Sequence, residues 1–221
     1  MASSAASAAA GAASLTTECA AGAEPAQPAA KGESAGIPGE DYRIASGRIR
    51  QSVMGWCFNP MPTDTLIDAC HAMGMPAMEG ISRSHYSRLR KLGMHVALVS
   101  SHGFKQGPLT RENHAMCRDK LREAIDVAVE YQSPSVITFT GMREKGVSDD
   151  QAMRNCVACW KDVIGYAEEK GVNLCLEHLN SRDDTHPMKG HPGYFGDDVD
   201  LCVELIKQVD SPRMKLLFDI Y

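Results

Sequence analysis

Short apolar runs alternate with longer amphipathic stretches along the chain from about residue 43 onward. Six of the short runs are typical of strands, and the last contains an apolar segment, Leu216 to Phe218, suited to a strand buried on both faces. We predict strands at residues 48–56, 76–82, 95–101, 135–141, 172–180 and 215–221.

The stretches between these runs place apolar residues three or four positions apart, which is the spacing of one face of a helix. Ser148 and Gln151 form the pattern of a capping box, and Gly171 marks the end of the helix that follows. We predict helices at residues 63–74, 84–93, 110–131, 149–170 and from 197 or 198 onward.

The last four predicted strands begin near residues 95, 135, 173 and 215, and one amphipathic helix joins each to the next. Repeated units of this kind form a parallel sheet with helices outside it, closed as a doubly wound sheet or as a (β/α)8 barrel. The sequence after the first strand, SVMGWCFNP, lacks the G-x-G-x-x-G fingerprint, which favours the barrel. We therefore expect an α/β fold, an incomplete TIM barrel with about six βα units, over residues 43–221.

Residues 1–42 have a different composition, rich in Ala, Ser and Gly and poor in large apolar side chains. Such a segment cannot bury enough surface to fold, so we predict a disordered tail. An organelle transit peptide is the alternative for this segment, and its lack of Arg weakens that alternative.

The overall composition limits the function classes. A net charge of -5 argues against a nucleic-acid-binding protein that works by neutralising phosphates. No run approaches eighteen apolar residues, so we expect no membrane span. The eight cysteines fall mostly within helix and strand patterns, which suits reduced thiols in a cytoplasmic protein.

Two acids occupy the carboxyl ends of predicted neighbouring strands, where a parallel barrel has its active site. Glu177 follows the apolar run NLCL, and Asp219 follows LLF. Strands five and six would lie about 4.8 Å apart, and carboxylates that close repel each other unless a divalent cation is shared between them. The alternative is that each acid caps a loop or pairs with Arg182 or Lys215.

Five segments together carry a family resemblance: GRIRQSVMGWCF, ITFTG, LEHLNSRD, HPGYF and SPRMKLLFDIY. In this order they resemble the hydroxypyruvate isomerase branch of the xylose isomerase-like superfamily of sugar isomerases and epimerases. The resemblance covers Gly47 to Tyr221, and its most specific parts are LE-x-LN-x-R and KL-x-x-DIY.

This resemblance implies a (β/α)8 barrel that binds one divalent ion, such as Mg²⁺ or Mn²⁺. It makes Glu177 the first metal ligand and one half of an acid/base pair, and Asp219 the second ligand. The family's ligands on strands seven and eight have no counterpart here, so the barrel is expected to be truncated at its C-terminus. The implied reaction is aldose–ketose isomerisation through an enediolate, hydroxypyruvate to tartronate semialdehyde or a related sugar or keto acid.

Three further residues are candidates for binding the substrate. Asn180 and Arg182 follow the fifth strand, where an Arg could bind a substrate carboxylate through two hydrogen bonds, or could instead pair with Asp183 or Asp184. His102 follows the third strand and could contact the substrate, or could be a hydrogen-bonded surface residue.

Two alternative roles remain open for each of two other residues near the predicted strand ends. Trp56 is either a wall of the pocket or part of the core, and Glu79 is either an acid beside the metal ligands or the partner of Arg83. His186 and His191 lie in a loop that could cover the site, but their spacing does not indicate a zinc site.

Three alternatives to the isomerase remain at this point. One is a non-catalytic barrel fragment whose last strand pairs with another chain, and a second is a sugar epimerase of the same superfamily. The third, a barrel of the endonuclease IV kind, needs more metal ligands and a basic surface, which the acidic balance argues against. We expect a small-molecule substrate, neither nucleic acid nor membrane as a partner, and leave homo-oligomer formation open.

Overall fold

The computed structural model describes residues 42–183, 185 and 190–220 of the 221-residue chain. The predicted tail therefore lies outside the described residues except for Tyr42, and the expectation of disorder stays a prediction.

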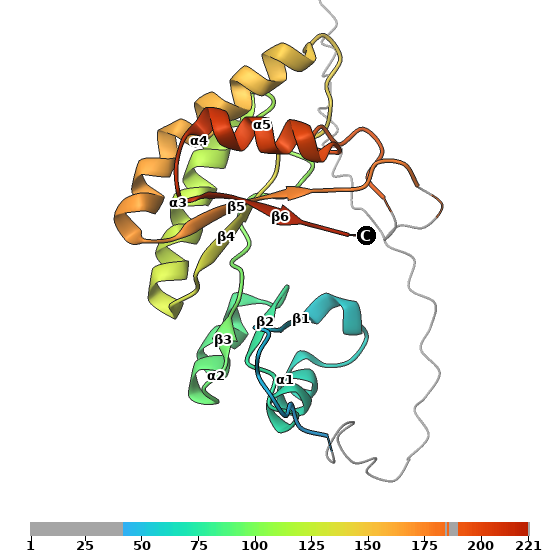
Figure 1. Cartoon of the computed structure of the whole chain (residues 1–221), viewed down its shortest axis with the longest axis vertical. Coiled ribbons are helices and arrows are strands. Elements are labelled where there is room, and N and C mark those ends of the chain that lie inside the picture. The colour runs from blue at the N-terminus through green and yellow to red at the C-terminus, as the bar shows by residue number, and fades with distance from the viewer. Residues whose placement is uncertain (1–41, 184, 186–189, 221) are drawn as a thin grey trace, which may run out of the picture. The chain divides into compact units, whose positions relative to one another are not determined.

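Six strands form in the predicted order, and each is shorter than the run that predicted it (Figure 1). They are β1 (Ser52–Met54), β2 (Ala77–Glu79), β3 (His95–Val96), β4 (Ser135–Thr138), β5 (Asn173–His178) and β6 (Met214–Phe218). They pair in parallel as two three-stranded sheets, β1-β2-β3 and β4-β5-β6. Sequential parallel order is the arrangement of a TIM barrel, whereas a doubly wound sheet reverses its strand order.

An isolated bridge joins the two sheets. Val99 forms a parallel bridge with Val136: its N–H donates to the carbonyl of Ser135 (2.9 Å), and its carbonyl accepts from the N–H of Ile137 (3.0 Å). Each strand is thus followed by its neighbour in sequence, and the predicted fold, a partial TIM barrel with six parallel strands, is confirmed.

In the described part of the chain, five α-helices and three short 3-10 helices connect the strands. They are α1 (Thr63–Ala72), α2 (Tyr86–Lys91), α3 (His114–Tyr131), α4 (Asp149–Lys170) and α5 (Val199–Val209), with η1 (Gly55–Phe58), η2 (Arg83–His85) and η3 (Arg111–Asn113). Figure 1 shows α3, α4 and α5 on one side of the sheet β4-β5-β6.

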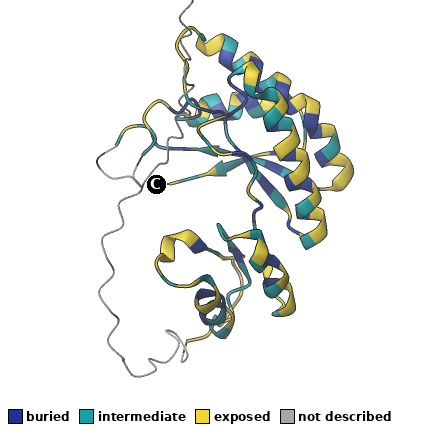
Figure 2. Ribbon diagram, turned by 180° about the vertical axis from the view of Figure 1, so that it is seen from behind, coloured by how far each residue is buried: buried dark blue, intermediate teal, exposed yellow. Residues whose placement is uncertain are grey.

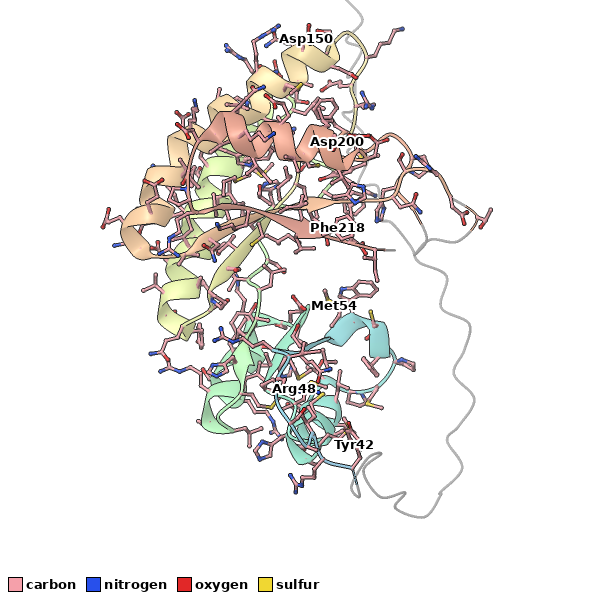
Figure 3. The ribbon with its side chains drawn as sticks, in the orientation of Figure 1. Tyr42, Arg48, Met54, Asp150, Asp200 and Phe218 are labelled. Atoms are coloured by element: carbon pink, nitrogen blue, oxygen red, sulfur yellow. The ribbon has the colours of Figure 1, made fainter. Side chains whose placement is uncertain are left out.

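The helix ends follow the signals in the sequence. The hydroxyl of Ser148 caps α4 by accepting from the N–H of Gln151 (3.3 Å), and α4 ends at Gly171, which has a φ of 71°. Asp198 caps α5 by accepting from the N–H of Leu201 (2.9 Å). Asp150 and Asp200, labelled in Figure 3, lie in the first turns of these helices, where a negative charge interacts favourably with the positive end of the helix dipole.

The core lies between the strands and their helices. Along β5, Leu174 and Leu176 are fully buried, whereas the alternate residues Cys175 and Glu177 are half-buried. Trp160 of α4 belongs to the same core, and Figure 2 shows buried residues concentrated where helices face strands. Burying each leucine side chain stabilises the fold by about 2 kcal/mol. The opposite face of the sheet, which carries Glu177, is less buried and is therefore where a functional site is expected.

The loops after β3 and β4 approach each other closely at two glycines. A Cβ atom on Gly107 would overlap the backbone of Thr140 and Gly141, and Gly141 has a φ of 102°. The N–H of Leu109 donates to the carbonyl of Thr140 across this contact (3.0 Å). The absence of a side chain at Gly107 is what allows these loops to touch.

The cysteines of the described residues are free thiols, and most of them are buried in the helix layer, as expected for reduced core residues. In the described part of the chain, no helix combines the length and apolar character needed to cross a membrane.

Candidate active site

Glu177 and Asp219 lie on the same face of the sheet, at the carboxyl ends of β5 and β6. Glu177 is paired with Leu217 in the parallel register, and Asp219 follows Leu217 by two residues, which returns it to that face. Burial raises the pKa of Glu177 to about 7, and the negative charge of Asp219 is the next cause. The two carboxylates are thus close enough to repel each other.

A third carboxylate, Glu79 at the end of β2, also acts on this site. Its charge adds to the rise in the pKa of Glu177. Glu79 accepts a hydrogen bond from the hydroxyl of Ser52 (2.5 Å), while Arg83 pairs with Glu123 at 2.5 Å. The alternative of a Glu79–Arg83 salt bridge is therefore wrong.

The donor atoms at this edge suit a hard divalent cation, because Mg²⁺ and Mn²⁺ prefer carboxylate oxygens. Among the described residues, however, no group of three or more His, Cys, Asp and Glu side chains is arranged to hold a metal ion. Glu177 and Asp219 would supply part of a ligand set. Within the same residues, no salt bridge joins Glu177 to Arg182 or Lys215.

Asn180 shapes the loop that leaves β5. Its side-chain oxygen accepts from the N–H of Arg182 (2.9 Å), and its carbonyl accepts from the N–H of His191 (2.7 Å). The Arg182 side chain is exposed. Asp183 accepts two hydrogen bonds from Thr185, while Asp184 and His186 lie outside the described residues. That Asn180 and Arg182 bind a substrate stays a prediction.

His102 is buried, with 4% of its surface exposed, so the alternative of a surface histidine is wrong. Its Nδ1 lies 3.2 Å from the carbonyl of Gly103, and its Nε2 lies 3.0 Å from the hydroxyl of Thr138. The carbonyl of Gly103 can only accept, so the ring N–H of the neutral imidazole faces it, and Nε2 accepts from the hydroxyl of Thr138, which itself accepts from the indole N–H of Trp160 (3.0 Å). The proton of the imidazole therefore resides on Nδ1, and burial lowers the pKa of His102.

A surface depression of about 510 Å³ lies beside His102. It is lined by residues of the loop after β3, including Ser101 and Gln106, and by Met116 and Lys120 of α3. None of the three carboxylates lines it, so it is separate from the carboxylate edge. A direct contact between His102 and a substrate stays a prediction.

His191 comes closer to the carboxylates than the sequence indicated. Its ring centroid lies 4.4 Å from that of Phe104. Burial lowers the pKa of His191, and the charge of Asp219 opposes that shift, which places the imidazole within electrostatic reach of Asp219. In the sequence, His191 belongs to a long loop after a strand and to HPGYF, one of the segments that carry the family resemblance.

Trp56 lies in η1 and is 45% exposed, so the alternative that it belongs to the core is wrong. A Cβ atom on Gly80 would lie 2.8 Å from Cδ1 of Trp56, so the indole packs over that glycine. Gly80 directly follows Glu79. Trp56 thus presents an aromatic surface next to one of the three carboxylates.

The comparison with protein families agrees with this arrangement. The model of the family described as xylose isomerase-like TIM barrel matches residues 67–221, which is most of the chain. The chain belongs to the xylose isomerase-like TIM barrel family. No curated protein matches the chain.

Solved structures show the same family fold. An AP endonuclease, family 2, from Brucella melitensis has a TM-score of 0.66 and 17% identity, with 77% of this chain and 67% of that chain covered. A D-tagatose 3-epimerase-like protein has a TM-score of 0.62 and 18% identity, with 78% and 65% covered. The 3-keto-D-glucoside 4-epimerase of E. coli has a TM-score of 0.61 and 13% identity, with 79% and 69% covered. The chain therefore spans about two thirds of the length of these xylose isomerase-like barrels.

Proposed function

We propose that the chain carries part of the active site of a metal-dependent isomerase that acts on a hydroxy-keto acid or sugar, with Glu177 as its acid/base group. The observation that supports this is the position of Glu177 and Asp219 at the carboxyl ends of adjacent strands, where burial and the charges of Asp219 and Glu79 raise the pKa of Glu177 to about 7 in the absence of a metal ion. A carboxyl group at such a position can both accept and return a proton, as isomerisation requires.

In this proposal Glu177 removes a proton from the hydroxyl-bearing carbon next to the substrate carbonyl and returns it to the former carbonyl carbon, while the hydroxyl proton passes to the former carbonyl oxygen. The carboxylates of Glu177 and Asp219 would hold the divalent ion, and their mutual repulsion supports the presence of a cation. When bound, such an ion polarises the carbonyl and adjacent hydroxyl oxygens of the substrate. The resemblance assigns the remaining ligands to strands seven and eight.

Hydroxypyruvate, converted to tartronate semialdehyde, is the substrate that the resemblance suggests. A neutral sugar is the second candidate, with epimerisation as the reaction, and two features of the site favour it. Glu79 adds negative charge, which disfavours an anionic substrate. The half-exposed Trp56 offers an aromatic surface of the kind on which the apolar face of a sugar packs.

The test is titration of Mn²⁺ by calorimetry against the unmodified chain and three variants. We expect Glu177→Gln and Asp219→Asn each to lower the Mn²⁺ affinity by at least about tenfold, since each removes an anionic ligand. Glu130→Gln, a change at an exposed residue of α3, is the matched control and should leave the affinity unchanged. Equal Mn²⁺ binding by all four proteins would exclude Glu177 and Asp219 as ligands.

The substrate is tested separately, with hydroxypyruvate and D-fructose as the two probes. Isomerase activity on hydroxypyruvate that a chelator abolishes would support the first candidate, and chelator-sensitive epimerisation of D-fructose the second. Metal binding without either activity would support the alternative of a non-catalytic chain that associates with another.

A further inference from the structure

The described residues that precede α5 contact the ends of β4 and β5. Residues 191–196 are the crossing segment, which is bound to the chain that follows β4 (Figure 1). The N–H of Arg143 donates to the carbonyl of Gly193 (2.7 Å), and the N–H of Phe195 donates to the carbonyl of Gly141 (3.0 Å). The crossing segment is therefore fixed by backbone hydrogen bonds on both sides of Tyr194.

Tyr194 is fully buried, and its hydroxyl bridges the ends of β4 and β5. The hydroxyl accepts from the N–H of Thr140 (3.0 Å) and donates to the carbonyl of Glu177 (2.8 Å). The directions follow from the chemistry, because an amide N–H can only donate and a carbonyl can only accept. Burial raises the pKa of Tyr194, so the phenol keeps the proton that this bridge requires.

The bridge occupies the place of a missing sheet hydrogen bond. In the ladder between β4 and β5, the N–H of Asn173 donates to the carbonyl of Pro134 (2.9 Å). In a parallel ladder the two strands donate in turn, and each kind of hydrogen bond recurs every two residues along its strand. Continued to the strand ends, this repeat makes the N–H of Thr140 face the carbonyl of Glu177. The hydroxyl of Tyr194 is inserted between these two groups, where the next bond of the ladder would form.

This insertion affects the residue that carries the proposed chemistry. The carbonyl of Glu177 accepts a hydrogen bond from the hydroxyl of Tyr194, and this hydroxyl oxygen lies between Glu177 and the N–H of Thr140. On its other side, β5 remains paired with β6, since Glu177 is in register with Leu217. The peptide of Glu177 is thus oriented by a side chain on one side and by the sheet on the other.

We infer that Tyr194 is a positioning residue: its hydroxyl, inserted between Thr140 and Glu177, sets the direction of the Glu177 carboxylate toward Asp219. This inference rests on the proposed function, because it assigns Tyr194 a role in the same site.

The matched pair of variants is Tyr194→Phe and Tyr86→Phe. Both delete one hydroxyl from a buried tyrosine, and Tyr86 is only 2% exposed, at the start of α2. Two quantities are measured at a temperature where both variants are folded: the Mn²⁺ affinity by calorimetry, and the ¹³C resonance of the Glu177 carboxyl group, assigned with Glu177→Gln. Thermal melts record the loss of stability separately.

We expect Tyr194→Phe to lower the Mn²⁺ affinity by about tenfold and to move the Glu177 resonance, while Tyr86→Phe changes neither. A lower melting temperature in Tyr194→Phe, with both site measurements unchanged, would overturn the inference and leave Tyr194 a purely structural residue. If the unmodified chain binds no Mn²⁺, the proposed function fails and the resonance alone decides. A shift in Tyr194→Phe then supports positioning, and an unchanged resonance refutes it.

Discussion

At the scale of single residues, the pKa of Glu177 depends on carboxylates at the ends of two other strands. Glu177 stands at the end of β5, and charges from the ends of β2 and β6 act on it through Glu79 and Asp219. Burial is the largest cause of its raised pKa, because removal from water disfavours the charged form. The same carboxyl group therefore links the stability of the fold to pH.

In metal-free protein, we expect the free energy of unfolding to fall as the pH rises from about 4.5 to about 7 through the contribution of Glu177. Across this range folded Glu177 keeps its proton while unfolded Glu177 loses it, so the folded state binds more protons. The loss is at most about 3 kcal/mol, and less because the carboxyl group is only partly buried.

Thermal melts in the presence of a chelator test this, with the difference between Glu177→Gln and the unmodified chain as the measured quantity. The variant should gain stability relative to the unmodified chain as the pH rises through this range and should keep that gain at pH 8. A difference that is constant from pH 4.5 to pH 8 would contradict the raised pKa.

The sequence predicted part of this site at the level of residues. Glu177 and Asp219 each follow an apolar run, and parallel strands bring such positions to one edge of a sheet. The sequence left two interpretations of Glu79 and could not decide between them, because Arg83, four residues away, was an obvious partner, whereas Arg83 in fact pairs with a residue forty positions on. The direction of the His102 ring, toward Thr138, depends on packing that the sequence pattern does not reveal.

At the scale of elements, the apolar periodicity predicted all six strands and all five α-helices, because each element buries one repeating face. The strand lengths were overestimated, as for β1, which has three residues, and β3, which has two. The predicted range of β3 included Val99, which forms only an isolated bridge with Val136 of β4. The loop after β3 passes closely over the chain after β4, at Gly107, and nothing in the local sequence indicates that contact.

We expect Gly107→Ala to destabilise the protein by about 1–3 kcal/mol, because the added methyl group would force the backbone of Thr140 and Gly141 to move. Gly103→Ala is the matched control, since a Cβ atom there meets nothing within 4 Å and it lies in the same loop. Urea denaturation measures both variants. Equal midpoints for the two would show that the loops can separate without cost.

At the scale of the molecule, the two faces of the strands differ in burial, and the two tryptophans of the chain report on that difference. Trp160 is fully buried in the helix layer, whereas Trp56 is 45% exposed beside the carboxylate edge. The barrel order could be predicted by counting βα units, because sequential parallel strands leave few topologies. The substrate could not be predicted in this way, because the side chains at the strand ends, and not the fold, determine which substrate binds.

Acrylamide should therefore quench the fluorescence of Trp56 and leave that of Trp160 largely unaffected. Trp56→Phe should remove most of the quenchable emission, and Trp160→Phe should leave it in place. Strong quenching that persists in Trp56→Phe would mean that the helix layer opens readily to small solutes. The same emission can report binding of a sugar near Glu79.

The alternation of buried and half-buried residues along β5 also bears on how such a protein can change over evolutionary time. Leu174 and Leu176 are constrained by the packing around them, so drift there is limited to hydrophobic residues of similar volume. Cys175 and Glu177, one position away in each case, are only half-buried, so packing constrains them less. New specificities can therefore arise by exchange of alternate residues on one strand, while the scaffold that holds them is inherited unchanged.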